Sequence, residues 1–398
     1  MDIDIDSIFP SDDFLTPEQL EIRRAVQKIT ANFPDSYWLE RDTDGKFPHD
    51  FGDAVAAAGW FGVTMPKEYG GAGLGVSEAA VVTQVVGRSG GASAAMSTVI
   101  HAMFGPQTIW KYGTEEQKRR WVPGLMKREI RPCFGVTEPN TGLDTTRLKT
   151  RAVKKGNTYY VTGQKIWTST AQIANKIMLI TRTTPIEETK RPIDGLTLFF
   201  TDLNRKYAEV RRIPKMGRLA VDSNQVFFDN MPVPEEDRIG EEGKGFYYLL
   251  DSLNPERILV AAGTLGIGKR AIARAADYAK NRVVFGRPIG QNQAIQHPLA
   301  ESWAKIQAAN LMTFKAAERF DARKSCGHLA NAAKFLAAEA SYEACERAVM
   351  THGGMGYAKE FHVERYLRES IILRIGPVTP PLMLSFIAEK MLGLPKSY

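Results

Sequence analysis

The sequence predicts an α+β multidomain protein with three successive parts: an N-terminal α-helical domain over residues 1–130, a middle antiparallel β-barrel over residues 131–240, and a C-terminal four-helix bundle over residues 241–398. Two observations predict this order. Apolar residues at helical spacing dominate both ends of the chain, whereas short β-branched and aromatic runs fill its middle. Because long helical segments do not separate these runs, a parallel βαβ sheet is disfavoured and an antiparallel barrel is favoured.

The N-terminal part carries clear helix signals. Thr16 is a suitable N-cap, and Pro17 suits the first helical position, where a backbone N–H has no intrahelical partner. Residues 66–75 predict a glycine-rich loop, and its spacing does not match the G-x-G-x-x-G turn of dinucleotide-binding folds. Residues 76–86 and 93–112 predict further buried helices.

The middle part contains five runs that predict strands, at residues 158–162, 165–167, 177–180, 196–200 and 225–228. The dipeptides Gly156-Asn157 and Thr162-Gly163 predict turns between neighbouring strands.

The C-terminal part predicts an up-down bundle of long helices. The first helix has Asn254 as its N-cap and Pro255 at its first position, and it runs into the stretch 282–288. Two further helices cover residues 294–323 and 329–352, and a C-terminal pair is broken near Pro377.

The first of these helices is the axis of the predicted bundle. Only Lys269 interrupts its apolar stripe, while Gly263, Gly266 and Gly268 cost about 1 kcal/mol each relative to alanine. Either a partner helix or a bound cofactor approaches these glycines closely. The same segment matches G-x-x-x-x-G-K, but Arg270 replaces the required Ser or Thr, and no strand precedes it, so a phosphate-binding loop is not predicted.

Composition narrows the class of protein. A content of 43% hydrophobic and 24% charged residues is typical of a soluble globular chain, and no apolar run is long enough to cross a bilayer. The acidic start at residues 1–6 is unlike a presequence or a secretory signal. Three cysteines without C-x-x-C spacing support neither a disulfide framework nor a zinc ribbon, so we expect a cytoplasmic protein.

Charge and histidine spacing exclude two further classes of site. The net charge is +7, but the basic residues are dispersed, so nucleic-acid binding is not favoured over an anionic small-molecule substrate. The six histidines lack metal-ligand spacing, and we predict no metal site.

Five motifs occur in order over nearly the whole chain and together resemble the acyl-CoA dehydrogenase family. They lie at residues 133–144, 163–167, 282–289, 293–296 and 352–357. The resemblance implies an enzyme whose middle barrel and C-terminal bundle enclose FAD. It also implies a homo-oligomer, a tetramer or a dimer.

The resemblance further implies two groups of cofactor-binding residues. Those at the flavin ring are Phe134, Val136, Thr137, Trp167 and Ser169, and Thr379 is a further expected cofactor-binding residue. Those at the pyrophosphate and adenine, reached partly from a neighbouring subunit, are Arg282, Phe285, Gln293, Gly353 and Gly354. Arginine suits this task because its guanidinium pairs well with pyrophosphate oxygens.

The expected catalytic base is displaced relative to many members of the family. Pro377 stands where those members have a Glu, and proline cannot accept a proton. A resemblance to isovaleryl- and long-chain acyl-CoA dehydrogenases instead implies Glu256, immediately before Arg257, as the base. A first-turn Glu also has a purely structural interpretation, because it complements the helix dipole.

The substrate contacts are implied in the same way. They are Asn254, Arg257 and Leu143, the last replacing a small polar residue of the family. Met350 and Pro381 are two further departures, each standing where a Gln is frequent.

The predicted function is FAD-dependent dehydrogenation of an acyl-CoA to the trans-2-enoyl-CoA, with electrons passed to an electron-transfer flavoprotein. The alternative is a flavin-bound relative without dehydrogenase activity, either nucleic-acid-associated or a non-redox acyl-CoA lyase.

Overall fold

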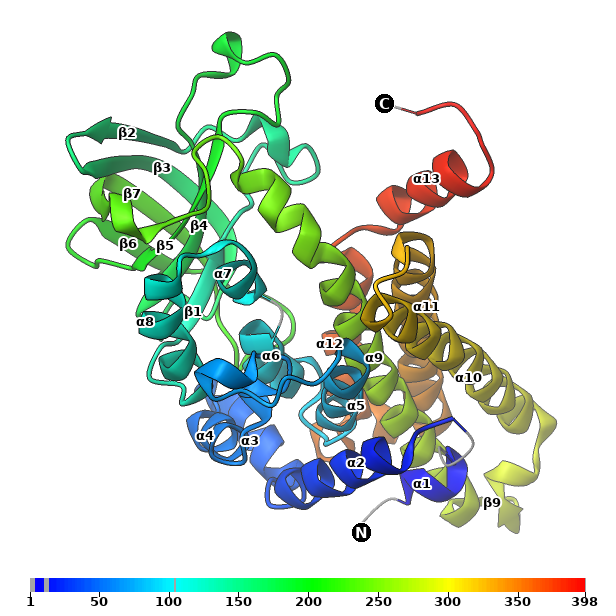
Figure 1. Ribbon diagram of the computed structural model, residues 1–398. Coiled ribbons are helices and arrows are strands. Elements are labelled where there is room, and N and C mark those ends of the chain that lie inside the picture. Colours follow the sequence, from blue (N-terminus) through cyan, green and yellow to red (C-terminus); the bar gives the residue numbers. More distant parts are fainter. Residues whose placement is uncertain (1–3, 11–13, 104, 398) are drawn as a thin grey trace.

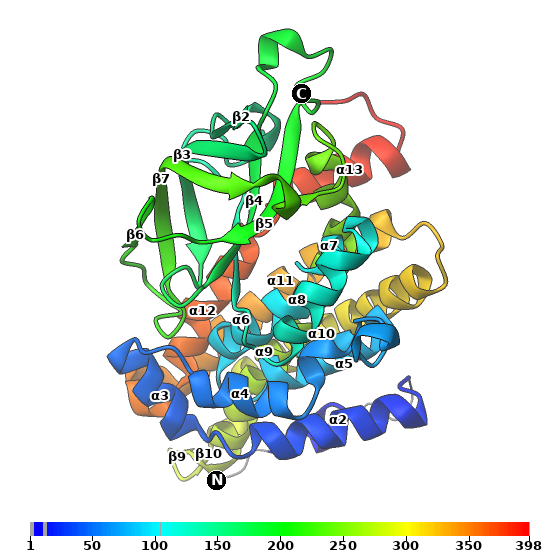
Figure 2. The same cartoon turned by 60° about the vertical axis from the view of Figure 1, so that its left-hand side comes forward.

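The computed structural model describes residues 4–10, 14–103 and 105–397, and it has the predicted order of a helical, a β and a second helical part (Figure 1). Residues 1–3 of the acidic start lie outside the described residues. The β part lies beside the N-terminal helices, and the C-terminal bundle completes the molecule on the other side (Figures 1 and 2). The predicted fold class is therefore confirmed.

The N-terminal part consists of short helices that pack on the bundle. They are α1 (Ile5–Ile8), α2 (Pro17–Thr30), α3 (Asp35–Asp44), α4 (His49–Ala57), α5 (Val76–Gly87), α6 (Ala92–Met103), α7 (Gln107–Tyr112) and α8 (Glu115–Met126). Thr16 and Gln19 form a capping box at the start of α2, as the sequence predicts for this helix start.

The helix expected over residues 93–112 is two helices, which corrects the prediction. α6 ends at Met103 and α7 begins at Gln107, and Phe104 between them lies outside the described residues. Pro106 precedes α7, and proline is unfavourable inside a helix. A Cβ built on Gly105 would lie 1.6 Å from the ring of Phe134, so any side chain at this position would collide with strand β1.

The middle part is one eight-stranded sheet with the order β6-β7-β3-β2-β4-β5-β8 and with β1 paired to β4. The strands are β1 (Pro132–Gly135), β2 (Arg151–Lys155), β3 (Thr158–Ser169), β4 (Lys176–Arg182), β5 (Leu196–Asp202), β6 (Ala208–Arg212), β7 (Ser223–Pro234) and β8 (Arg238–Ile239). Most pairs are antiparallel, but β1 and β2 each pair with β4 in parallel.

One expected turn in this sheet is wrong. The runs 158–162 and 165–167 form the single strand β3, and Gly163 lies inside it. The pairing of β3 with β7 shifts register between Val161 and Gly163, and Gly163 has φ +148°. The glycine therefore marks a bulge, and its Cβ position is blocked by Thr150 at 2.6 Å.

The C-terminal part contains α9 (Gly245–Asn281), α10 (Gln293–Asp321), α11 (Gly327–His352), α12 (Val363–Ile375) and α13 (Pro380–Met391). A small hairpin of β9 (Val283–Val284) and β10 (Arg287–Pro288) joins α9 to α10, so the axial helix does not extend through residues 282–288 as expected. Single 3-10 turns lie at Trp60–Gly62, Lys67–Tyr69, Thr145–Arg147, Ile186–Glu188, Glu235–Asp237, Ile289–Gln291, Gly353–Tyr357 and Lys359–Phe361.

The start of α9 also differs from the prediction. The helix begins at Gly245, and Pro255 lies inside it instead of at its first position. A Cβ on Gly245 would lie 2.4 Å from the backbone nitrogen of Leu198, so the helix starts in direct contact with strand β5. This contact fixes the helix start, and the missing N–H of Pro255 removes only one intrahelical hydrogen bond.

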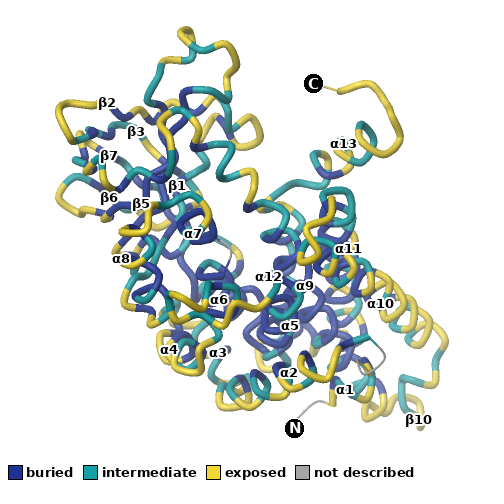
Figure 3. The backbone as a smooth tube through the Cα atoms, in the orientation of Figure 1, coloured by how far each residue is buried: buried dark blue, intermediate teal, exposed yellow. Residues whose placement is uncertain are grey.

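The glycines of α9 face partner helices, so close helix packing, and not a bound cofactor, explains why they are needed. A Cβ on Gly266 would lie 2.3 Å from the carbonyl oxygen of Gln84 on α5, and one on Gly268 would lie 2.8 Å from Ser341 Oγ on α11. The buried Lys269 reaches the amide oxygens of Gln84 and Asn310, at 2.9 and 3.4 Å. Buried residues accordingly concentrate around α5, α6 and α9, whereas α13 is a mixture of intermediate and exposed residues and the hairpin is largely exposed (Figure 3).

The described residues contain no single helix that is both long and apolar enough to cross a membrane; only the bent pair α12 and α13 meets that criterion together, by length and composition. Within the same residues, no group of three or more His, Cys, Asp or Glu side chains is arranged to hold a metal ion. α8 ends at Met126 and α9 begins at Gly245, and we keep 1–130, 131–240 and 241–398 as the proposed domain limits.

Candidate active site

A cavity of about 1310 Å³ lies where the β part meets both helical parts. Its walls come from β1, from the end of β3, from the loop before β7, from α6 and α9, and from the segment joining α12 to α13. Most of the lining is apolar, with a small number of charged and hydroxyl side chains. This combination is typical of a site that binds a large, partly aromatic ligand.

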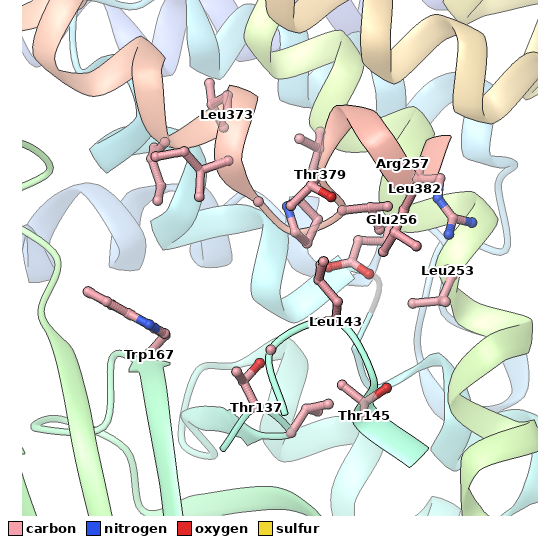
Figure 4. Close-up of a pocket in the computed structure, with 18 of the residues that line it drawn as sticks. Thr137, Leu143, Thr145, Trp167, Leu253, Glu256, Arg257, Leu373, Thr379 and Leu382 are labelled. Carbon is pink, nitrogen blue, oxygen red and sulfur yellow. The ribbon is translucent and has the colours of Figure 1, made fainter. Parts of the chain in front are cut away.

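Glu256 is the carboxylate that α9 presents to this cavity (Figure 4). It lies about three turns inside the helix, so the helix N-terminus no longer influences it as a first-turn residue would. Burial raises the pKa of Glu256 to about 7, and the nearby Arg257 and Lys334 oppose that rise. A carboxyl group with a pKa near neutrality can act as a general base at physiological pH.

Arg257 and Lys334 are the two cations that lower the pKa of Glu256. Arg257 lines the cavity, and its guanidinium donates to Asn254 Oδ1 at 3.2 Å. Lys334 of α11 is buried, and its ammonium donates to the carbonyl oxygen of Leu373 and, at 3.2 Å, to that of Val378. Leu373 and Val378 lie on either side of Pro377 in the sequence, so Lys334 holds the turn between α12 and α13 beside the cavity.

The floor of the cavity is the strand β1 and the segment that follows it. Phe134, Val136 and Thr137 all line the cavity. Glu138, which also lines the cavity, forms an ion pair with the buried Lys165 at 2.9 Å, and Lys165 donates to the carbonyl oxygen of Val136 at 3.1 Å. Burial lowers the pKa of Lys165 to about 8, against the raising influence of Glu138.

Trp167, near the end of β3, lies on the other side of the cavity from Glu256 (Figure 4), and Ser169 of the same strand also lines the cavity. Trp167 lines the cavity and is 55% exposed, so its indole has open space beside it. Its backbone has φ +60°, and that of Thr170 has φ +62°. A bulky residue adopts this region only under strain, which is common at functional sites.

Thr379 and Leu143 complete the rim of the cavity (Figure 4). The hydroxyl oxygen of Thr379 is buried and makes no hydrogen bond among the described residues. Leu143 is 59% exposed in the loop after β1. An unsatisfied buried hydroxyl beside an open cavity indicates that a ligand supplies its partner.

Asn254 is not brought into the cavity. It faces a neighbouring surface pocket, together with Gly327 and Phe386. Because Pro255 is internal to α9, Asn254 does not act as an N-cap either, and this expectation is wrong.

The second group of expected cofactor residues lies at the opposite end of α9. Arg282 and Phe285 are exposed at the hairpin, roughly 40 Å from Glu256 along the helix axis. Gln293, Gly353 and Gly354 are also exposed. A single chain therefore does not bring this group to the cavity that holds the first group.

Sequence reasoning missed several cavity residues. Arg218, Lys215 and His101 line the cavity, and Lys334 acts on it from behind. Glu138 and Lys165 lie within the motifs at residues 133–144 and 163–167, but the sequence of these motifs does not indicate that the two side chains form an ion pair. No sequence signal distinguishes a lone Arg or His in a loop or helix from an ordinary surface residue.

Two helical parts and a β part enclose one large cavity, in which an aromatic side chain faces a carboxyl group of near-neutral pKa. This architecture defines a three-domain enzyme whose site can hold a cofactor and a substrate together. Models of the acyl-CoA dehydrogenase N-terminal, middle and C-terminal domains match residues 16–129, 133–231 and 243–392.

Individual proteins agree with these matches. The acyl-CoA dehydrogenase fadE12 of Mycobacterium bovis is 32% identical over 390 residues, which cover 96% of this chain and 97% of that protein. The caffeyl-CoA reductase-Etf complex subunit CarC of Acetobacterium woodii is 31% identical over 379 residues, 94% of this chain and 98% of that one. Butyryl-CoA dehydrogenase from Megasphaera elsdenii has a similar structure, with a TM-score of 0.90 and 28% identity, over 96% of this chain and 100% of that chain.

The chain therefore belongs to the acyl-CoA dehydrogenase family. It is an oxidoreductase that acts on acyl-CoA, and FAD is the cofactor of this family.

The residues of the cavity fit the ring system of FAD. Trp167 and Phe134 offer aromatic and apolar surface, and the unsatisfied hydroxyl of Thr379 offers a polar contact at the rim. The volume of about 1310 Å³ exceeds that of an ordinary small-ligand pocket, roughly 300–1,000 Å³, as a site for both a cofactor and a substrate must.

Proposed function

We propose that this protein dehydrogenates an acyl-CoA thioester between Cα and Cβ to give the trans-2-enoyl-CoA, with Glu256 as the base that accepts the α-proton. Bound FAD supplies the hydride-accepting chemistry. The single observation that carries the proposal is the position of Glu256: a carboxyl group of pKa about 7 that enters the cavity from α9 (Figure 4).

The opposite wall supports this arrangement. Trp167 lies across the cavity from Glu256 (Figure 4) and, with Ser169, would hold the flavin ring. Phe134, Val136, Thr137 and Thr379 also line the cavity and would contribute further contacts to FAD. A substrate bound between the two walls would present its α-carbon to the carboxylate of Glu256 and its β-carbon to the residues that would hold the flavin. Closure of the apolar cavity around the acyl chain excludes water and keeps the carboxyl group poised to accept a proton.

Pro377 supports the assignment of the base by exclusion. It lines the cavity at the position where many relatives carry a Glu, and it has no ionisable group. Arg257 and Leu143 also line the cavity and would contact the substrate, whereas Asn254 lies outside it and would act only through its hydrogen bond with Arg257.

Three further parts of the proposal concern partners and location. A relative described as a subunit of a caffeyl-CoA reductase-Etf complex supports an electron-transfer flavoprotein as the electron acceptor.

The separation of the two groups of cofactor residues supports a homo-oligomer, a tetramer or a dimer, in which Arg282, Phe285, Gln293, Gly353 and Gly354 serve a neighbouring subunit. All three cysteines are buried and unpaired, which supports a reducing, cytoplasmic location.

The proposal is tested by mixing the FAD-loaded enzyme anaerobically with straight-chain, branched and cyclic acyl-CoAs. We expect at least one of them to bleach the flavin absorbance, with the matching enoyl-CoA as product. A fully loaded enzyme that no member of a broad panel bleaches would contradict dehydrogenation. Retention on DNA at physiological salt in the same preparation would instead favour the nucleic-acid-associated alternative.

A further inference from the structure

The loop of residues 215–221, between β6 and β7, enters the cavity and is held rigidly by two cations. The ammonium of Lys215 donates to the carbonyl oxygens of Gly217, Arg218 and Val221, and the distances to Gly217 and Val221 are 3.2 and 2.8 Å. Arg368 of α12 donates to the carbonyl oxygen of Met216 at 3.0 Å. The loop is therefore preorganised before any ligand binds.

Close backbone packing then forces an unusual conformation at Arg218. A Cβ on Gly217 would lie 2.7 Å from the carbonyl oxygen of Arg368, so the loop touches α12 backbone to backbone. The next residue, Arg218, has φ +56°. This left-handed conformation is unfavourable for a non-glycine residue, and the contacts of the loop maintain it.

The result is a guanidinium on the cavity wall beside Ser169. Arg218 lines the cavity, and its terminal nitrogen donates to Ser169 Oγ at 2.5 Å. Burial lowers the pKa of Arg218, while Glu369 and Asp222 raise it from a distance. An arginine nevertheless stays charged in a protein.

Arg218 makes no ion pair within the part of the chain that the structure describes. Glu369 accepts hydrogen bonds from Ser93 Oγ and the backbone N–H of Ala94, at 3.0 and 2.9 Å. Asp222 accepts from the backbone N–H of Gln172 at 3.1 Å and from the amide of Asn224. Neither acid lies within ion-pair distance of Arg218, although both act on it from further away, so its guanidinium remains available to a ligand in the cavity.

The hydrogen bond also orients the hydroxyl of Ser169. A guanidinium has donors only, so Ser169 Oγ must accept from Arg218. The proton of that hydroxyl is left to point elsewhere, and the cavity is the open space beside it. Arg218 thus converts Ser169 into a donor aimed at a ligand.

We propose that Arg218 is a positioning residue for the flavin ring: it fixes the Ser169 hydroxyl as a hydrogen-bond donor into the cavity and raises the reduction potential of bound FAD through its charge. This inference rests on the proposed function. The physical reason is that the reduced cofactor carries more electron density, which a nearby cation in a poorly hydrated site stabilises.

The test uses the FAD-loaded holoenzyme and measures the midpoint potential of its flavin without substrate. We expect Arg218→Gln to lower the equilibrium constant for two-electron reduction at least tenfold, a fall of about 30 mV. Ser169→Ala, which keeps the cation but removes the hydroxyl, should lower it less. Combining the two substitutions should give less than the sum, because the residues act together.

Arg211→Gln is the matched control. Arg211 is an exposed arginine of β6 whose ion pair is with Glu209, and its loss should leave the potential unchanged.

Several outcomes would overturn the inference. An unchanged potential in FAD-loaded Arg218→Gln would do so. If that variant also lost activity only with acyl-CoAs that carry a second carboxylate, the role of Arg218 would be recognition of the substrate. If Arg218→Gln does not retain FAD, the Ser169→Ala variant decides, because an unchanged potential there removes the hydroxyl donor from the argument. A wild-type protein that binds no FAD would instead contradict the proposed function itself.

Discussion

The carboxyl group of Glu256 is controlled by three neighbouring features. Burial disfavours its charge, while Arg257 on the same helix and Lys334 on α11 favour it, and the balance places its pKa at about 7. Lys334 is itself affected, because burial lowers its pKa to about 8 against the influence of Glu256. At neutral pH the base is thus partly ionised and can both accept and release a proton.

Replacing the base should separate chemistry from binding. We expect Glu256→Gln to retain the fold and FAD, and to reduce the rate of flavin reduction by acyl-CoA roughly 100-fold or more. In the wild type the same rate should fall as the pH drops through about 7, because protonation removes the base. Stopped-flow absorbance over a range of pH measures both effects.

The control for this substitution is Glu318→Gln, a change of the same type at an exposed carboxylate of α10 that pairs with Lys315. A Glu256→Gln enzyme within a few-fold of the wild-type rate would show that the base lies elsewhere.

Glu256→Gln should also change how the free energy of unfolding depends on pH. The folded pKa of Glu256 lies above its ordinary value of 4.5, so the folded state binds more protons between pH 4.5 and 7. This group therefore destabilises the protein increasingly as the pH rises through that window. Glu256→Gln should be more stable than the wild type at pH 8, by about 3 kcal/mol, and about equal near pH 4, by chemical denaturation.

At the scale of elements, α9 is the helix that connects the cavity to the rest of the molecule. It starts against β5, carries Glu256 past the cavity, and then passes between α5 and α11 at its glycines. The close contact of Gly266 with the backbone of α5 places α9 at a fixed depth. That depth in turn sets how far Glu256 extends into the cavity.

Adding a single methyl group to α9 should therefore destabilise the protein. Alanine normally favours a helix by about 1 kcal/mol over glycine, but the Cβ of Gly266→Ala would meet backbone atoms at 2.3 and 2.8 Å, which cannot move aside alone. We expect a net loss on the order of 1–3 kcal/mol in the free energy of unfolding, measured by denaturation of the FAD-free protein.

Gly142→Ala is a suitable comparison, since nothing lies within 4 Å of its Cβ position. An equal stability of Gly266→Ala and Gly142→Ala would contradict the packing of α9 on α5.

At the scale of the whole molecule, the exposed hairpin after α9 is the feature that a single chain does not explain. Phe285 at its tip is 100% exposed with φ +53°, and Met350 and Tyr357 nearby in the bundle are 74% and 87% exposed. Large apolar side chains gathered at one exposed end of a bundle indicate an interface. The expected cofactor residues Arg282 and Gly353 lie at the same end of the molecule.

Replacing Arg282 of the hairpin should weaken FAD binding more than it lowers the stability of the fold. If Arg282 pairs with the pyrophosphate of FAD held by another subunit, Arg282→Ala should reduce FAD occupancy several-fold while the unfolding transition of the FAD-free protein stays unchanged. Gel filtration with light scattering, combined with the ratio of flavin to protein, measures both. A wild-type monomer with full FAD occupancy would contradict the shared site and the oligomer together.

The sequence by itself determined the order of the domains, the start of α2 and most strands of the sheet, because these depend on local periodicity, capping and turn chemistry. It also indicated the family and pointed to Glu256, since Pro377 cannot be a base. Both conclusions depended on recognising residue types in order along the chain, and folding does not change that order.

Tertiary structure decided what depends on distant contacts. Arg218 meets Ser169 across 49 residues of sequence, and Lys334 meets Glu256 from another helix, so neither neighbour was visible in the chain. The start of α9 at Gly245 was set by contact with β5, which overrode the local signals of Asn254 and Pro255. The pKa of Glu256 follows from the same cause, because desolvation is a property of everything packed around a group and not of its place in the sequence.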